Sequence, residues 1–83
     1  MIYSVVYSRN AGKELGKLPA EVQQRIKSAM ERIRFRPEAY LVRLVDDAAF
    51  KLRIGGYRAI IDADTENRRL NVLKVGHRKA IYK

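Results

Sequence analysis

The sequence has no cysteine, only two prolines, and half as many acidic as basic residues. Without cysteine, disulfide bonds and thiolate metal sites are excluded, and nothing favours an oxidising compartment. No apolar run approaches the ~20 residues of a membrane-spanning helix. The N-terminal residues also lack the basic flank and apolar stretch of a signal peptide. We therefore expect a cytoplasmic protein without a membrane partner.

The chain has 83 residues, of which 47% are hydrophobic, and no internal repeat or low-complexity segment divides it. These properties are typical of one small globular domain, here spanning residues 1–83. A domain of this size has a modest core, so a partner is expected to add to its stability.

Positive charge is the most informative feature of the composition. Eighteen Lys and Arg residues oppose nine Asp and Glu, for a net charge of +9, and such an excess favours polyanions such as nucleic acid. Residues 51–58 and 68–83 contain basic residues and no acid, whereas glutamates dilute the positive charge of the first half. We therefore place the functional surface in the second half and expect it to bind nucleic acid, an anionic membrane or an acidic protein.

The first half has the pattern of a strand followed by two helices. Residues 2–8 are rich in β-branched and aromatic side chains, and Ser8 is suited to cap a helix. Pro19 suits the first turn of a second helix, which Pro37 ends. The apolar stripe of that helix consists of Val22, Ile26, Ala29, Met30 and Ile33.

The second half changes to a strand pattern. Residues 50–54 alternate strictly between apolar and basic side chains, which is typical of a strand with one buried face, and Gly55-Gly56 indicates a hairpin turn. Further extended segments are expected at residues 40–45, 57–63 and 70–75, with a polar turn at 64–68. We therefore predict an α+β fold, in which the N-terminal strand and the two-helix hairpin pack on a curved antiparallel sheet.

Basic residues of the second half are expected to converge on the open face of this sheet. Lys51 and Arg53 share a face, and the Gly-Gly turn brings Arg58 back beside them. Arg58 is expected to be exposed there, so that it does not support the core. The candidate site residues are Lys51, Arg53, Arg58, Arg78 and Tyr82, with His77 as an accessory candidate and Lys74, Lys79 and Lys83 as RNA contacts.

Such a cluster of cations suits a phosphodiester. Arginine makes bidentate contacts to phosphate oxygens and stabilises the extra charge of a pentavalent transition state. Lys51, among like charges, is the candidate proton acceptor, and Tyr82 is the candidate for base stacking or for orienting the attacking oxygen. Because RNA carries its own nucleophile, the 2′-hydroxyl, this site needs neither a metal nor a cofactor.

Simpler interpretations stand beside catalysis. A basic sheet face is most often solvated or a passive nucleic-acid surface, and a lone His77 is more often structural or simply exposed. Tyr82 is equally consistent with packing. Asp62 and Asp64, together with Glu66, have the spacing of a solvated turn rather than that of a metal site.

Residues 50–83, FKLRIGGYRAIIDADTENRRLNVLKVGHRKAIYK, resemble the C-terminal half of the RelE/ParE toxin superfamily, specifically its RelE branch. The shared pattern is a basic strand, the motif GYR, a hydrophobic strand ending in VGHR, and a later tyrosine. The opening strand, the helical hairpin broken by Leu18-Pro19, and Arg43-Leu44 fit the same family. The resemblance implies the RelE-like, microbial ribonuclease-type fold and a toxin that cleaves mRNA in the ribosomal A site without metal.

The resemblance also implies a role for each candidate residue. Lys51 resembles the general base, Arg53 a second basic residue that stabilises the phosphate, and Arg58 the arginine that clamps the scissile phosphate. Arg78 resembles the arginine that protonates the leaving 5′-oxygen, and Tyr82 the tyrosine that orients or stacks on the substrate. The chain ends one residue after Tyr82, whereas some family members continue into a C-terminal helix.

The implied partners are an acidic antitoxin, the ribosome with its rRNA and A-site mRNA, and operator DNA only indirectly through the antitoxin. ParE-like toxins share the fold and the YR motif but poison DNA gyrase, so gyrase inhibition is the alternative function. A non-catalytic RNA-binding protein or an inactivated toxin is the third. The full set of five candidate residues favours an mRNA endoribonuclease.

Overall fold

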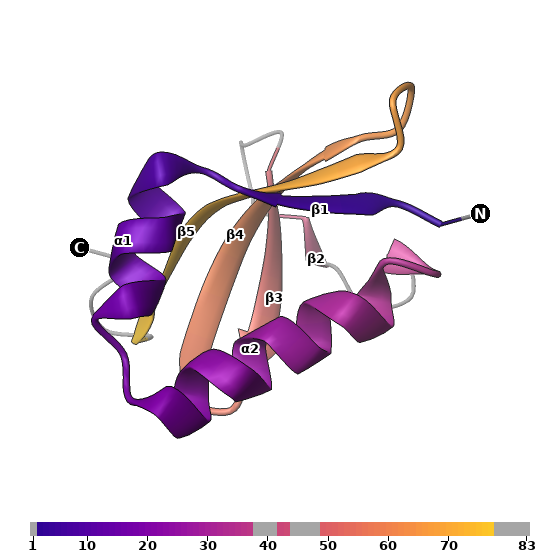
Figure 1. The fold of residues 1–83 in the computed structure, drawn as a ribbon. Helices are drawn as coiled ribbons and strands as arrows, with labels where there is room; N and C mark the ends of the chain where they lie inside the picture. Colours follow the sequence, from indigo (N-terminus) through magenta and orange to yellow (C-terminus); the bar gives the residue numbers. More distant parts are fainter. Residues whose placement is uncertain (1, 38–41, 44–48, 78–83) are drawn as a thin grey trace.

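The computed structural model describes residues 2–37, 42–43 and 49–77, which form two helices and five strands (Figure 1). In chain order these are β1 (Ser4–Tyr7), α1 (Arg9–Gly16), α2 (Ala20–Ile33), β2 (Val42–Arg43), β3 (Phe50–Ile54), β4 (Tyr57–Asp64) and β5 (Arg69–His77). None of the described helices is long and apolar enough to cross a membrane. The predicted α+β fold is confirmed.

The strands form one sheet in the order β1-β5-β4-β3-β2. The predicted antiparallel meander is confirmed for β2 through β5, but β1 pairs with β5 in parallel, so the sheet is mixed. The connection between β1 and β2 explains the parallel pairing. The helical hairpin carries the chain from one sheet edge to the other, and the meander then returns until its last strand lies beside the first (Figure 1).

The two helices begin where the sequence indicates. The side-chain oxygen of Ser8 accepts a hydrogen bond from the Ala11 amide at 3.0 Å and caps α1, as predicted. Pro19 lies at the N-cap of α2, one position before the expected first turn, and its carbonyl accepts from the amides of Val22 and Gln23.

Helix α2 ends at Ile33, earlier than the predicted stop at Pro37. Arg34 caps it and joins it to the residue before β1, because Tyr3 N donates to Arg34 O at 2.9 Å and Arg34 Nε donates to Tyr3 O at 3.2 Å. The end of α2 is therefore held by the backbone of Tyr3.

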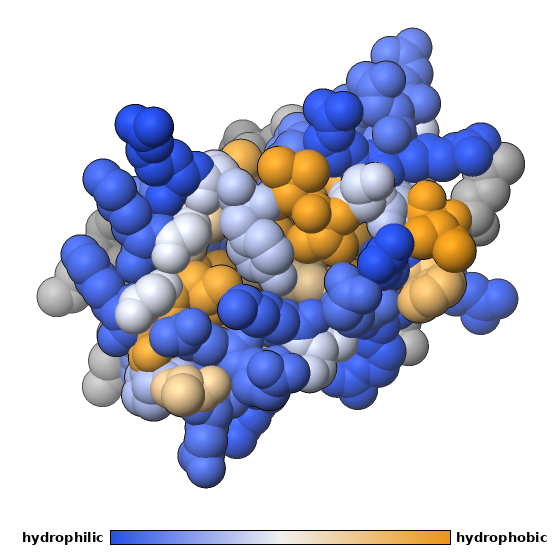
Figure 2. Space-filling view, viewed as in Figure 1, coloured by the Kyte–Doolittle hydropathy of each residue, from blue (hydrophilic) through white to orange (hydrophobic). Residues whose placement is uncertain are grey.

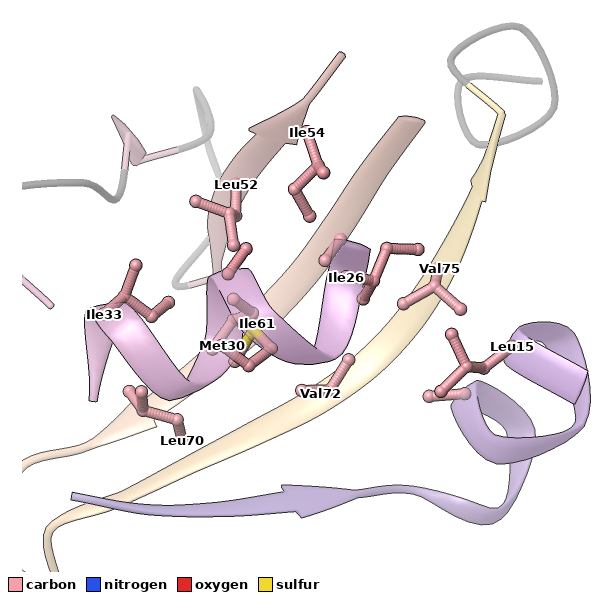
Figure 3. Packing of buried hydrophobic residues seen from close by; sticks show 13 residues of the cluster. Leu15, Ile26, Met30, Ile33, Leu52, Ile54, Ile61, Leu70, Val72 and Val75 are labelled. Carbon is pink, nitrogen blue, oxygen red and sulfur yellow. The ribbon is translucent and has the colours of Figure 1, made fainter. Parts of the chain in front are cut away.

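The core lies between the helices and one face of the sheet (Figure 3). Helix α2 contributes Ile26, Met30 and Ile33, which are at most 2% exposed, and α1 contributes Leu15. The strands contribute Leu52, Ile54, Ala59, Ile61, Leu70, Val72 and Val75. This burial supplies most of the stabilisation of the fold.

The helix-bearing side is largely hydrophilic on its outside. Its hydrophobic residues show over β1, between β1 and α2, and near the end of α1 that leads into α2 (Figure 2). Tyr3, Val5 and Tyr7 of the β1 region are partly buried against the core there. The opposite face of the sheet lies behind this view.

Two turns hold strand β4 in place. Gly55, in the β3–β4 turn, has φ +61, a conformation in which glycine avoids the cost of a Cβ atom. In the β4–β5 turn, the side-chain and backbone nitrogens of Asn67 donate to the Asp64 carboxylate at 2.8 and 3.1 Å. These hydrogen bonds hold the pKa of Asp64 below its usual value.

Arg68 gives a test of the β4–β5 turn, because it adopts a left-handed φ of 51 that a long side chain disfavours. Asparagine tolerates this conformation better. We expect Arg68→Asn to raise the free energy of unfolding by roughly 0.5–1 kcal/mol, measured by urea denaturation. Arg69→Asn, in the adjoining strand, is the control and should give no gain. Equal effects of the two substitutions would contradict this description of the turn.

Candidate functional site

The candidate residues of β3 and β4 lie on the sheet face that points away from the helices. Leu52 and Ile54 belong to the core, so Lys51 and Arg53, which alternate with them, point to the other side. Arg58 is paired directly with Arg53 across the two strands. The strand register therefore places Lys51, Arg53 and Arg58 on one face of the sheet, as predicted.

Strand β5 adds one more cation to this face. Lys74 pairs with Ile60, and Gly76 pairs with Arg58. Because Val75 is a core residue, its neighbours Lys74 and Gly76 face away from the helices. We call Lys51, Arg53, Arg58 and Lys74 the basic face.

The four residues of the basic face differ in depth. Arg53 and Lys74 are exposed and Lys51 is half-buried, whereas Arg58 is only 3% exposed. The expectation of an exposed Arg58 was wrong. Alternation along the strand assigns the face of Arg58 but not its depth, and Arg58 lies on the central strand β4, between β3 and β5.

The Arg58 guanidinium is poorly satisfied for a buried cation. Its Nη1 donates to the carbonyl of the adjacent Tyr57 at a long 3.3 Å, and its Nε has no hydrogen-bond partner within the described structure. Leaving a buried donor unpaired costs about 1–3 kcal/mol. An anion that reached this guanidinium would supply the missing acceptor and the missing negative charge.

His77 lies apart from the basic face. Its partner across the strands is Tyr57, whose own partner on β3 is the core residue Ile54. Tyr57 and His77 therefore share the helix side of the sheet, where their rings meet edge to face at 5.5 Å between centroids. This position separates His77 from Arg58, so the accessory role suggested for it gains no geometric support.

The remaining candidates, Arg78, Lys79, Tyr82 and Lys83, lie outside the described residues, and their roles stay predictions. Sequence reasoning also missed the position of the acidic residues. By alternation along β4, Asp62 and Asp64 share the face of Arg58, towards the far end of the strand. Asn71 donates to Asp62 at 3.4 Å. No group of metal-ligating side chains forms among the described residues.

Comparisons with known proteins identify the family of this chain. Residues 5–82 match the family model described as the ParE toxin of the type II toxin–antitoxin system parDE. The chain belongs to the RelE/ParE superfamily of toxins from type II toxin–antitoxin systems. Within that superfamily it is a RelE-type toxin, as its similarity to solved RelE structures shows.

The solved structures extend the similarity over nearly the whole chain. A mutant of the Escherichia coli toxin RelE in the free state is 30% identical, with a TM-score of 0.79, and the match covers 96% of this chain and 87% of that one. A chain of the RelBE2 toxin–antitoxin complex from Mycobacterium tuberculosis is 26% identical with a TM-score of 0.83, covering 94% and 100%. A chain of the archaeal RelE–RelB complex from Pyrococcus horikoshii, 22% identical with a TM-score of 0.78, shows the same fold. A search of curated proteins finds no match.

The burial of Arg58 makes a prediction about stability. Replacing a buried, poorly paired charge by an apolar side chain of similar shape is often stabilising. We expect Arg58→Met to raise the free energy of unfolding by about 1–2 kcal/mol in chemical denaturation. Arg53→Met, on the exposed partner, is the matched control and should change it by less than ~0.5 kcal/mol. A clear loss of stability in Arg58→Met would mean that the guanidinium is better satisfied than described.

Proposed function

We propose that this toxin is a metal-independent, ribosome-dependent endoribonuclease that cleaves mRNA in the A site and so inhibits translation. The observation that carries the proposal is the buried Arg58 guanidinium, with an unpaired Nε, beside Arg53 on an open sheet face. A preorganised cation of this kind suits the charge that develops on a phosphorane. From the resemblance to RelE we infer that the ribosome positions the RNA.

The proposed reaction is a transesterification within the RNA. Lys51 takes the proton of the 2′-hydroxyl, and the 2′-oxygen forms a bond to the adjacent phosphorus. Arg58 and Arg53 hold the non-bridging oxygens as negative charge accumulates. The bond from phosphorus to the 5′-oxygen then breaks, and Arg78 gives that oxygen a proton. The products are a 2′,3′-cyclic phosphate and a 5′-hydroxyl, with Tyr82 orienting the substrate.

The proposed regulator is an acidic antitoxin. The net charge of +9 favours an acidic partner, and similar solved structures are toxin–antitoxin complexes. Binding over the basic face would neutralise Arg53 and Lys74 and exclude RNA. Operator DNA would then be contacted only through the antitoxin, and the complex would reside in the cytoplasm.

Gyrase inhibition is the second candidate function, because the matching family model describes a ParE toxin. A gyrase inhibitor needs a binding surface but no preorganised phosphate site. Gyrase inhibition would not require the unpaired Nε of Arg58, whereas in the proposed RNA cleavage this nitrogen would bind the phosphate. A non-catalytic RNA-binding protein or an inactivated toxin is the third candidate.

Parallel assays of cleavage and supercoiling separate these functions. We expect the purified toxin to cut mRNA at defined positions on programmed ribosomes and to leave gyrase supercoiling unchanged. Arg58→Met should lower the cleavage rate by ~10²–10³ because a transition-state donor is lost, without loss of folding. Lys27→Ala, on the exposed side of α2, is the control and should cut at the wild-type rate.

Other results of these two assays would identify one of the alternative functions. Inhibited supercoiling without mRNA cuts would show a ParE-like toxin, and RNA binding without either effect would show a non-catalytic protein. Cleavage by Arg58→Met at the wild-type rate would mean that the site is misplaced.

A further inference from the structure

Helix α1 continues the edge of β5 where β1 stops. Strand β1 pairs with β5 only as far as Val72, and Ser8 N donates to Val72 O at 2.9 Å as the chain turns into α1. Beyond that point, polar side chains of α1 and of its N-cap form hydrogen bonds with the backbone of β5. Ser8 Oγ and Asn10 Nδ2 both donate to the Leu73 carbonyl, at 3.2 and 3.3 Å.

Glu14 completes this set of contacts one turn further along the helix. Its Oε1 accepts from the Val75 amide at 3.1 Å and from Asn10 Nδ2 at 3.2 Å. Leu15, the next residue, points towards Val75 in the core (Figure 3). The N-cap Ser8 and two residues of α1 one turn apart, Asn10 and Glu14, thus hold the backbone of β5 between Leu73 and Val75.

This segment of β5, Leu73 to Val75, begins with a β-bulge. Ile60 pairs with Lys74 and Ile61 pairs with Val72, so Leu73 is an extra residue on β5. The Leu73 carbonyl and the Val75 amide lie at and next to this bulge, on the edge of β5 that β1 no longer covers. The hydrogen bonds with Ser8, Asn10 and Glu14 satisfy them there.

The bulge decides which side chains of β5 reach the basic face. With regular alternation after the core residue Val72, Lys74 would point into the core and Val75 would lie on the open face. The extra residue reverses this order, so that Lys74 joins the basic face and Gly76 lies opposite Arg58.

We propose that Glu14 is a positioning residue, whose carboxylate fixes the bulge of β5 and so presents the end of that strand to Arg58. This inference rests on the proposed function, in which the basic face is the catalytic surface. Glu14 touches neither RNA nor the reacting atoms. Its effect passes through the backbone of Val75.

The test compares Glu14→Ala with Glu14→Gln, which keeps the oxygen that accepts from Val75. In single-turnover cleavage on programmed ribosomes, Glu14→Ala should lower the maximal rate about tenfold, while the half-saturating toxin concentration stays within twofold. Glu14→Gln should restore the rate. The control is Val22→Ala, which trims a partly buried side chain of α2 and, despite its lower melting temperature, should cut at close to the wild-type rate.

A second measurement does not depend on cleavage. Amide hydrogen exchange at Val75 and Gly76 should speed up at least tenfold in Glu14→Ala, and return to the wild-type rate in Glu14→Gln. Unchanged exchange in Glu14→Ala overturns the inference, as does a loss of cleavage that only follows melting temperature across all three variants. If the wild-type toxin does not cut mRNA, the proposed function fails, and the exchange rates alone decide whether Glu14 fixes the bulge.

Discussion

The segment of strand β4 from Arg58 to Ile61 is buried on both faces of the sheet, and the rest of the structure depends on this constraint. On the helix side, Ala59 and Ile61 are fully buried against the core. On the other side, Arg58 is buried without adequate partners. An unpaired buried cation is unfavourable by itself, so it persists only because the packing of α2 against the opposite face holds the strand in place. A structural feature that costs stability in this way is typical of a functional site.

The open face is divided along its length. Near the β3–β4 turn it carries Arg53 and Arg58, and towards the β4–β5 turn it carries Asp62 and Asp64. Hydrogen bonds from Asn67 and the charge of Arg69 keep the pKa of Asp64 below its usual value. Arg69, which pairs with Asp64, offsets part of the negative charge at that end. The attraction for a polyanion is therefore strongest near Arg53 and Arg58.

Much of the fold could be predicted because it follows from local patterns. The alternation of residues 50–54, the Gly55-Gly56 turn and the Ser8 cap each indicate their structure within a few residues. The parallel pairing of β1 could not be predicted, because it depends on contacts between strands more than 60 residues apart, such as Val5 with Leu70. The burial of Arg58 and the sheet face on which His77 lies could not be predicted from the sequence for a related reason. Alternation gives the face of a residue but not what flanks it, and the bulge at Leu73 shifts the register without any glycine to signal it.

We propose that the buried Arg58 guanidinium is the anion site of the basic face. This can be measured from the NMR signal of the Arg58 Nε–Hε group while a 2′-deoxy dinucleotide, which lacks the nucleophile, is added to the full chain. We expect a saturable shift and slower hydrogen exchange at Arg58 Nε as the phosphate becomes its hydrogen-bond partner. A dinucleotide that shifts the signals of Arg53 and Lys74 but leaves Arg58 Nε unchanged would contradict it.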